Sequence, residues 1–90
     1  MAVGIVFNGL GVTQAQYDQV LGEVAPGNKL PPGMLYHAGG PSKDGWRVVE
    51  IWESQEAADR FFKETLGASL QKASITVVPE FFQVHNIMKP

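Results

Sequence analysis

The chain contains no cysteine, and this absence excludes several kinds of chemistry. Without that residue there is no disulfide framework, no thiolate nucleophile and no cysteine-ligated metal. Basic charge is also scarce, since 7 Lys and Arg stand against 9 Asp and Glu and no basic run occurs. Because nucleic acids and anionic membranes bind basic patches, we expect neither as a partner.

Long apolar runs are missing as well. No stretch approaches the roughly 20 residues that a membrane-spanning helix needs. The apolar segment over residues 1–8 lacks the basic flank and the length of a signal peptide. The sequence therefore predicts a soluble cytoplasmic protein.

What the chain does contain is enough apolar material for one core. Hydrophobic residues make up 44% of the 90 residues and charged residues 18%, which is typical of a compact globular protein. This length suits a single domain. We therefore expect one domain over residues 1–90.

Local patterns predict four strands and two helices. Runs rich in β-branched and aromatic residues predict strands over residues 2–8, 34–38, 46–53 and 81–88. Thr13 and Gln16 have the spacing of a capping box ahead of an apolar stripe that ends near Val24. Ser54 is a suitable N-cap for a second helix, in which Gly67 predicts a kink or an early end. The order β-α-β-β-α-β predicts an α+β, ferredoxin-like fold, with a four-stranded antiparallel sheet and two helices on one face.

Side chains alternate along strands, and this divides the sheet residues into two sets. One set is purely apolar in the third and fourth strands, and we expect it to face the helices. The other set is mixed and we expect it on the uncovered face; it contains Trp46, Val48, Glu50, Trp52, Phe81, Gln83, His85 and Ile87. Left in water, it would exceed the roughly 300–600 Å² apolar patch of a typical monomer. The simplest cover is a second copy, so we predict a homodimer with its sheets face to face.

Two further segments carry a resemblance to a known family. The Trp-Glu-Ser sequence at residues 52–54 leads into a helix with Phe61 and Phe62, and Phe-Gln-Val-His-Asn closes the last strand at residues 82–86. With the strand order and length, these segments resemble the dimeric α/β-barrel superfamily, and within it the small antibiotic-biosynthesis-monooxygenase-like proteins.

Members of that superfamily include cofactor-independent oxygenases, haem-degrading enzymes, isomerases and proteins without known activity. The resemblance implies a small-molecule-binding protein, and more finely a monooxygenase-like enzyme acting on a small aromatic or polyketide-like compound. It implies no cofactor, because neither histidine matches the haem-binding position of the haem-degrading members. Similarity of fold alone does not establish that two proteins share a function.

The interior between the two sheets is where we expect the site. The candidate catalytic residues are His37, His85 and Glu50, because a histidine that titrates near neutrality beside a carboxylate suits acid–base work. Aromatic and amide side chains would bind an apolar or aromatic ligand. These candidates are Trp46, Trp52, Phe81 and Gln83.

Two alternatives stay open at this point. The same two histidines and Glu50 would make a two-His, one-carboxylate metal set, but no local His spacing supports it and we predict no metal. The protein would otherwise be a non-catalytic dimer that binds a ligand or packs its interior solid. An open cavity facing His37 or His85 would favour the enzyme.

Overall fold

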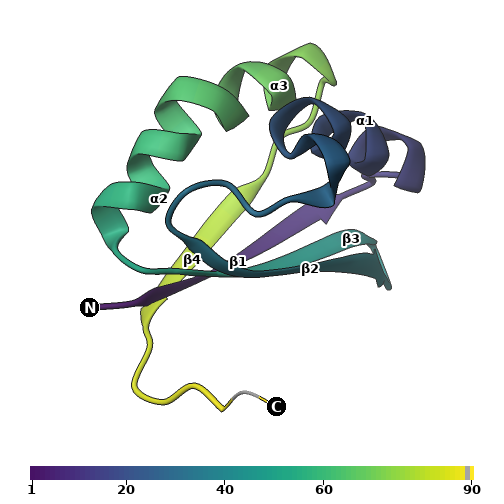
Figure 1. The fold of residues 1–90 in the computed structure, drawn as a ribbon. Helices are drawn as coiled ribbons and strands as arrows, with labels where there is room; N and C mark the ends of the chain where they lie inside the picture. The colour runs from purple at the N-terminus through teal and green to yellow at the C-terminus, as the bar shows by residue number, and fades with distance from the viewer. Residues whose placement is uncertain (89) are drawn as a thin grey trace.

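The computed structural model describes residues 1–88 and 90, and it is drawn in Figure 1. In chain order the elements are β1 (Val3–Leu10), α1 (Gln14–Val24), a short 3-10 turn η1 (Pro26–Asn28), β2 (Met34–Ser42), β3 (Gly45–Trp52), α2 (Gln55–Phe61), a π-helical segment η2 (Phe62–Leu66), α3 (Gly67–Lys72) and β4 (Val78–Gln83). One sheet carries all the helices on a single face (Figure 1). The predicted α+β, ferredoxin-like fold is therefore confirmed.

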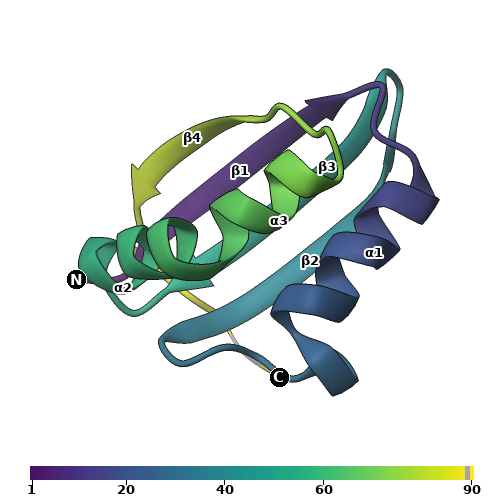
Figure 2. The same cartoon turned by 90° about the horizontal axis from the view of Figure 1, so that it is seen from above.

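The four strands form one sheet in the order β2-β3-β1-β4, and every neighbouring pair is antiparallel. Seen from above, α1 lies on the β2 side while α2 and α3 lie over the middle of the sheet (Figure 2). None of the helices among the described residues is long and apolar enough to cross a bilayer.

The helix starts form as their sequences predict. The Thr13 hydroxyl accepts the backbone N–H of Gln16 at 3.2 Å, and the Gln16 side chain accepts the Thr13 N–H at 3.0 Å. The Ser54 hydroxyl caps α2 by accepting the N–H of Ala57 at 3.1 Å. Both caps satisfy N–H groups that the helix itself leaves without partners.

The second helical stretch is irregular where Gly67 indicates it. Its N–H bonds to the carbonyl of Phe62, five residues back, so the turn before it is π-helical. A side chain at residue 67 would bring its Cβ to 3.1 Å from that same carbonyl oxygen. The absence of a Cβ at Gly67 therefore keeps this wide turn free of crowding.

The expected assignment of the two sheet faces is wrong. The mixed set of β3 faces the helices: Trp52 is 1% exposed and Glu50 is 5% exposed, whereas Val49 is 38% exposed on the other face. Residues opposite one another in an antiparallel pair share a face. Val3, Ile5 and Phe7 of β1 are buried, and they pair with the buried Trp52 and Glu50 and with the partly buried Val48.

The reason is that both sets are rich enough in apolar residues to form a core. The polar members of the mixed set are then tolerated inside only if they are paired, because an unpaired buried polar group is costly. Glu50 meets this condition through hydrogen bonds from His37 and Trp52. The alternation rule cannot anticipate that pairing.

The last strand also differs from its prediction. β4 starts earlier, at Val78, and ends at Gln83, so residues 84–88 lie beyond it rather than within it. Pro79 is tolerated inside β4 because this strand is at the edge of the sheet. The chain after β4 runs to the side of the sheet away from the helices (Figure 1).

Candidate functional site

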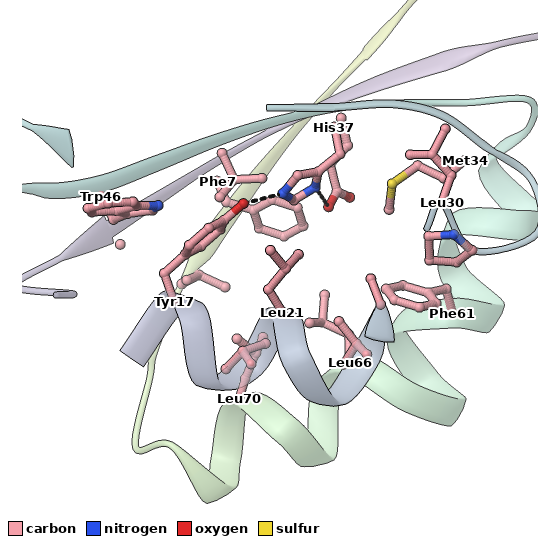
Figure 3. A pocket seen from close by; sticks show the side chains of 18 of the residues that line it. Phe7, Tyr17, Leu21, Leu30, Met34, His37, Trp46, Phe61, Leu66 and Leu70 are labelled. Carbon is pink, nitrogen blue, oxygen red and sulfur yellow. Dashed lines mark hydrogen bonds and ion pairs between the residues drawn. The ribbon is translucent and has the colours of Figure 1, made fainter. Parts of the chain in front are cut away.

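A cavity of about 380 Å³ lies between the covered face of the sheet and the helices. Its walls are mainly apolar, and it is large enough for a small ring system. Figure 3 shows it from close by. The walls include Phe7, Val20, Leu21, Met34, Val48, Phe61, Leu66, Leu70 and Ile75.

A chain of hydrogen bonds crosses the polar side of this cavity. The Tyr17 hydroxyl lies 2.6 Å from Nε2 of His37, and Nδ1 of His37 lies 3.0 Å from Oε2 of Glu50 (Figure 3). Behind them, the Trp52 indole N–H donates to Oε1 of Glu50 at 3.0 Å. Four side chains from α1, β2 and β3 are thereby linked at the edge of the cavity.

The register of β2 on β3 brings His37 to Glu50. These two residues are directly opposite one another. A register shift between Met34 and Tyr36 places both Met34 and His37 opposite helix-facing residues of β3, although their spacing is odd. This β-bulge therefore turns the His37 side chain toward the helices.

Tyr17 reaches His37 because β2 has a glycine beneath it. An added Cβ at Gly39 would lie 2.7 Å from the Tyr17 hydroxyl oxygen and 2.7 Å from Cζ of its ring. The capping box fixes where α1 begins and therefore the height of Tyr17 above the sheet. The hydrogen bond between Tyr17 and His37 thus depends on local structure on both sides: the glycine in β2 and the capping box of α1.

One set of proton positions satisfies every link of the chain. As a carboxylate, Glu50 accepts from Trp52 and from Nδ1–H of His37, so Nε2 of His37 accepts the Tyr17 proton. Burial raises the pKa of the Tyr17 phenol, and the charges of Glu50 and Asp18 raise it further. In this arrangement Tyr17 is a neutral donor to Nε2 of His37, and its oxygen can accept a hydrogen bond.

Trp46 lies beside this chain. Its ring is 5.2 Å from the Tyr17 ring, centroid to centroid, with 32° between their planes. Within the described part of the chain, its buried indole nitrogen has no hydrogen-bond partner. The Trp46 ring therefore gives the cavity an aromatic wall, while its nitrogen is enclosed by protein.

The structure brings together some of the predicted site residues. His37, Glu50 and Trp46 line the cavity, and Trp52 supports it from behind, holding Glu50 and packing on the Phe61 ring at 5.2 Å. Whether they catalyse or bind stays a prediction.

The other predicted residues lie elsewhere. Phe81 lines a smaller neighbouring hollow, while Gln83 and His85 are exposed and line neither space. The prediction that His37 and His85 share a pocket on the uncovered face is wrong. His37 is on edge strand β2 under the helices, and His85 follows the opposite edge strand β4.

The hypothetical metal set fails for the same reason, because His85 is not near His37 and Glu50. Among residues 1–88 and 90, no three His, Asp or Glu side chains gather closely enough to hold a metal ion.

Sequence reasoning missed Tyr17, whose position in the apolar stripe of α1 made it look like a core residue. The available signal was its hydroxyl, since a Tyr facing a core normally has a hydrogen-bond partner for that group. Its partner is 20 residues away and on another element. Only the docking of α1 on β2 identifies it.

Comparison with known proteins gives no match to a family model or to a curated protein sequence. Solved structures do match over nearly the whole chain. SnoaB, a cofactor-independent oxygenase from Streptomyces nogalater, is 12% identical with a TM-score of 0.68, over 99% of this chain and 97% of SnoaB. A proposed antibiotic biosynthesis monooxygenase from Chloroflexus aurantiacus is 16% identical with a TM-score of 0.70, over 99% and 98%.

A third similar structure contains a ligand. It is the ActVA-Orf6 monooxygenase of Streptomyces coelicolor in complex with nanaomycin D, 22% identical with a TM-score of 0.57, over 99% of this chain and 91% of that one. At these identities the likeness establishes the fold. The chain thus has the fold of antibiotic-biosynthesis-monooxygenase-like proteins, as its sequence resemblance implies.

Proposed function

We propose that this protein is a cofactor-independent monooxygenase-like enzyme acting on a small aromatic or polyketide-like compound. The observation that carries the proposal is the Tyr17–His37–Glu50 chain, which ends at an apolar cavity. Such a chain is built to accept a proton from a bound molecule. The similarity in fold to a cofactor-independent oxygenase and to a monooxygenase with a bound ligand supports it.

The proton moves in two linked steps. The substrate gives a proton to the Tyr17 oxygen while the Tyr17 proton passes to Nε2 of His37. Glu50, fixed by Trp52, then stabilises the imidazolium by its negative charge. The proton thus ends on His37, and Tyr17 is the group that touches the substrate.

The substrate anion supplies the electrons that molecular oxygen requires. For a methylene group between aromatic rings, the overall change consumes one molecule of oxygen, converts the methylene into a carbonyl and releases one molecule of water. One oxygen atom enters the new carbonyl, and the other leaves as water with the two hydrogens of the methylene group. The apolar walls retain the substrate and keep bulk water from its anion.

Oxygen uptake with anthrone, a tricyclic ketone with an acidic methylene group, tests this proposal. Tyr17→Phe and His37→Gln should each lower kcat about 100-fold or more, as loss of general-base catalysis does. His85→Gln is the matched control and should leave kcat unchanged, because His85 is exposed outside the cavity. Equal effects of His37→Gln and His85→Gln would contradict the proposed site.

A non-catalytic ligand-binding protein is the second candidate, and the apolar lining of the cavity favours it equally. A thermal-shift screen of aromatic ketones and quinones separates the two functions, since a bound ligand raises the melting temperature by mass action. Binding without oxygen uptake by any bound compound would establish the second function.

We also propose that the chain forms a homodimer through the uncovered face of its sheet, in the cytoplasm. The residues differ from those first expected, since the large exposed side chains there include Tyr36, Val49 and Phe82, at 42%, 38% and 46%. Val6 and Ile51 lie between them, partly exposed. An apolar sheet face of this kind is well suited to a second copy.

A further inference from the structure

A second, smaller hollow of about 150 Å³ lies between the edge strand β4 and the helical stretch of α2 and η2. Of the described residues that line it, only the exposed Asp59 is polar, and its carboxylate accepts a hydrogen bond from Gln55 at 3.0 Å. The remaining lining is aliphatic and aromatic. Apolar spaces of this order of size bind xenon and small apolar molecules.

A single layer of side chains separates this hollow from the main cavity. Phe7, Phe61 and Leu66 line both spaces. In Figure 2 the stretch formed by α2 and α3 runs over the sheet, with α1 on one side of it and β4 on the other. Residues of α1 border the main cavity, and residues of β4 border the hollow. The two spaces are therefore neighbours across one helical partition.

The hollow opens to solvent on the side away from the main cavity. Phe62 and Phe81 line the hollow but not the main cavity, and they are 43% and 45% exposed. The partition is irregular here, because the π-helical segment η2 begins at Phe62 and ends at Leu66. Such turns are frequent at functional sites. An apolar path thus leads from solvent, past Phe62 and Phe81, to the wall of the main cavity.

The proposed reaction brings two molecules of different size into one cavity. The aromatic compound occupies the main cavity, and dioxygen then has to reach it. Dioxygen is small and uncharged, so apolar surroundings favour it over water. The hollow offers it a place one side-chain layer from the substrate, on a path that does not cross the occupied cavity.

We infer that the hollow binds dioxygen and supplies it to the main cavity across the wall of Phe61 and Leu66. The supply of oxygen rests on the proposed function, whereas the binding of an apolar gas in the hollow does not. The step forms and breaks no bond and needs only a movement of the wall side chains. Binding and supply can therefore be tested separately.

The first experiment uses xenon, an apolar atom that takes the place of dioxygen, and isoleucine methyl groups as NMR probes. The four isoleucines divide between the two spaces: Ile5 lines the hollow, Ile75 lines the main cavity, and Ile51 and Ile87 line neither. With anthrone bound and oxygen excluded, xenon should move the Ile5 methyl signal. The Ile51 and Ile87 signals should stay in place, and the Ile75 signal should respond only when anthrone is absent.

Two outcomes of this experiment overturn the inference. One is an Ile5 signal that does not respond to xenon. The other is an Ile5 signal that responds only without anthrone, since xenon would then occupy the main cavity alone. If Ile5 responds as expected but anthrone takes up no oxygen, the proposed function fails and the gas site stands.

The second experiment fills the hollow with a side chain. Ala58 is 5% exposed and lines the hollow but not the main cavity, so Ala58→Met places a longer apolar side chain there. The kcat/KM for oxygen should fall about tenfold, within the range over which variants of one site alter association rates. The KM for anthrone should be unchanged. Ala68→Met is the matched control and should behave as the wild type, because Ala68 is exposed on α3 and lines neither space.

Xenon gives the same test in the wild type if Ala58→Met does not fold. It should inhibit oxygen uptake in competition with oxygen and not with anthrone. An unchanged kcat/KM for oxygen in folded Ala58→Met would overturn the supply route while oxygenation itself stands. Inhibition by xenon that competes with anthrone alone would overturn it as well.

Discussion

Residue 39 has room for hydrogen and for nothing larger. The ring and hydroxyl of Tyr17 occupy the position of a Cβ there, and that same hydroxyl bonds to His37. Gly40, the next residue, has open space where its Cβ would be. Of these two adjacent glycines, only Gly39 therefore has a steric role in the contact between Tyr17 and His37.

This contrast gives a matched pair of variants. Gly39→Ala should push Tyr17 away from His37 and lower the free energy of unfolding by about 1–3 kcal/mol, the usual cost of overpacking. Gly40→Ala should change it by less than about 0.5 kcal/mol, as surface substitutions usually do. Urea denaturation measures both. Similar losses in the two variants would mean that Tyr17 is not held over Gly39.

The site residues that the sequence predicts are those whose residue type alone suggests binding or catalysis. His37, Glu50 and Trp46 stand out by type, whereas Tyr17 is recognisable only by what it touches. Alternation along the last strand groups Gln83 and His85 with Phe81. Gln83 is exposed at the last position of β4, and alternation no longer applies to His85 beyond the end of the strand.

At the scale of the elements, a cluster of polar side chains joins α1 to α3. Glu23 accepts from Ser69 at 2.5 Å and from Lys72 at 2.8 Å. These hydrogen bonds, from Lys72 first and then Ser69, hold the pKa of Glu23 below its ordinary value of 4.5. Since both helices border the cavity, this cluster keeps one of its walls in place.

A lowered carboxyl pKa has a defined effect on stability against pH. The unfolded chain binds the proton more readily than the folded one, so the contribution is complete above about pH 4.5 and disappears as the pH falls through the folded pKa. We expect the melting temperature of the wild type to fall more steeply below pH 4.5 than that of Glu23→Gln. Glu64→Gln, an exposed change in η2, should follow the wild type; equal slopes for wild type and Glu23→Gln would refute the cluster's role.

Neighbouring phenylalanines at the end of α2 and the start of η2 face different surroundings. Phe61 packs on Trp52 at 5.2 Å, whereas Phe62 is 43% exposed. Phe61→Ala should therefore cost about 3 kcal/mol, near the lower end for a core phenylalanine. Phe62→Ala should cost less than half as much. Thermal or urea unfolding of the two variants would show the reverse order if the helix were docked by its other face.

At the scale of the whole molecule, the sheet presents one face to the helices and another to solvent. Placing a charge on the solvent face should separate the proposed dimer, because an unpaired charge would be buried between two sheets. Val49→Asp should therefore lower the mass in solution from twice the 9.8 kDa of one chain to that of one chain. Gln55→Asp, exposed on α2, should not. Light scattering that finds a wild-type monomer at micromolar concentration would refute the dimer.

The elements follow from the sequence because their causes are local. The capping box at Thr13, the N-cap at Ser54 and the irregularity before Gly67 each depend on residues within a few positions. The order of strands and helices then leaves few ways to build one sheet with a covered face. Length, composition and local signals were therefore sufficient for the class of fold.

Tertiary structure alone decided which face the helices cover, and with it the site. Alternation separates two sets of side chains but is symmetrical between the faces, and here each set has enough apolar residues to form a core. The choice was made by contacts between distant residues: the bulge between Met34 and Tyr36 that turns His37 inward, the pairing of His37 with Glu50, and the docking of Tyr17 over Gly39. Such contacts arise from the fit of whole elements, so no local pattern records them.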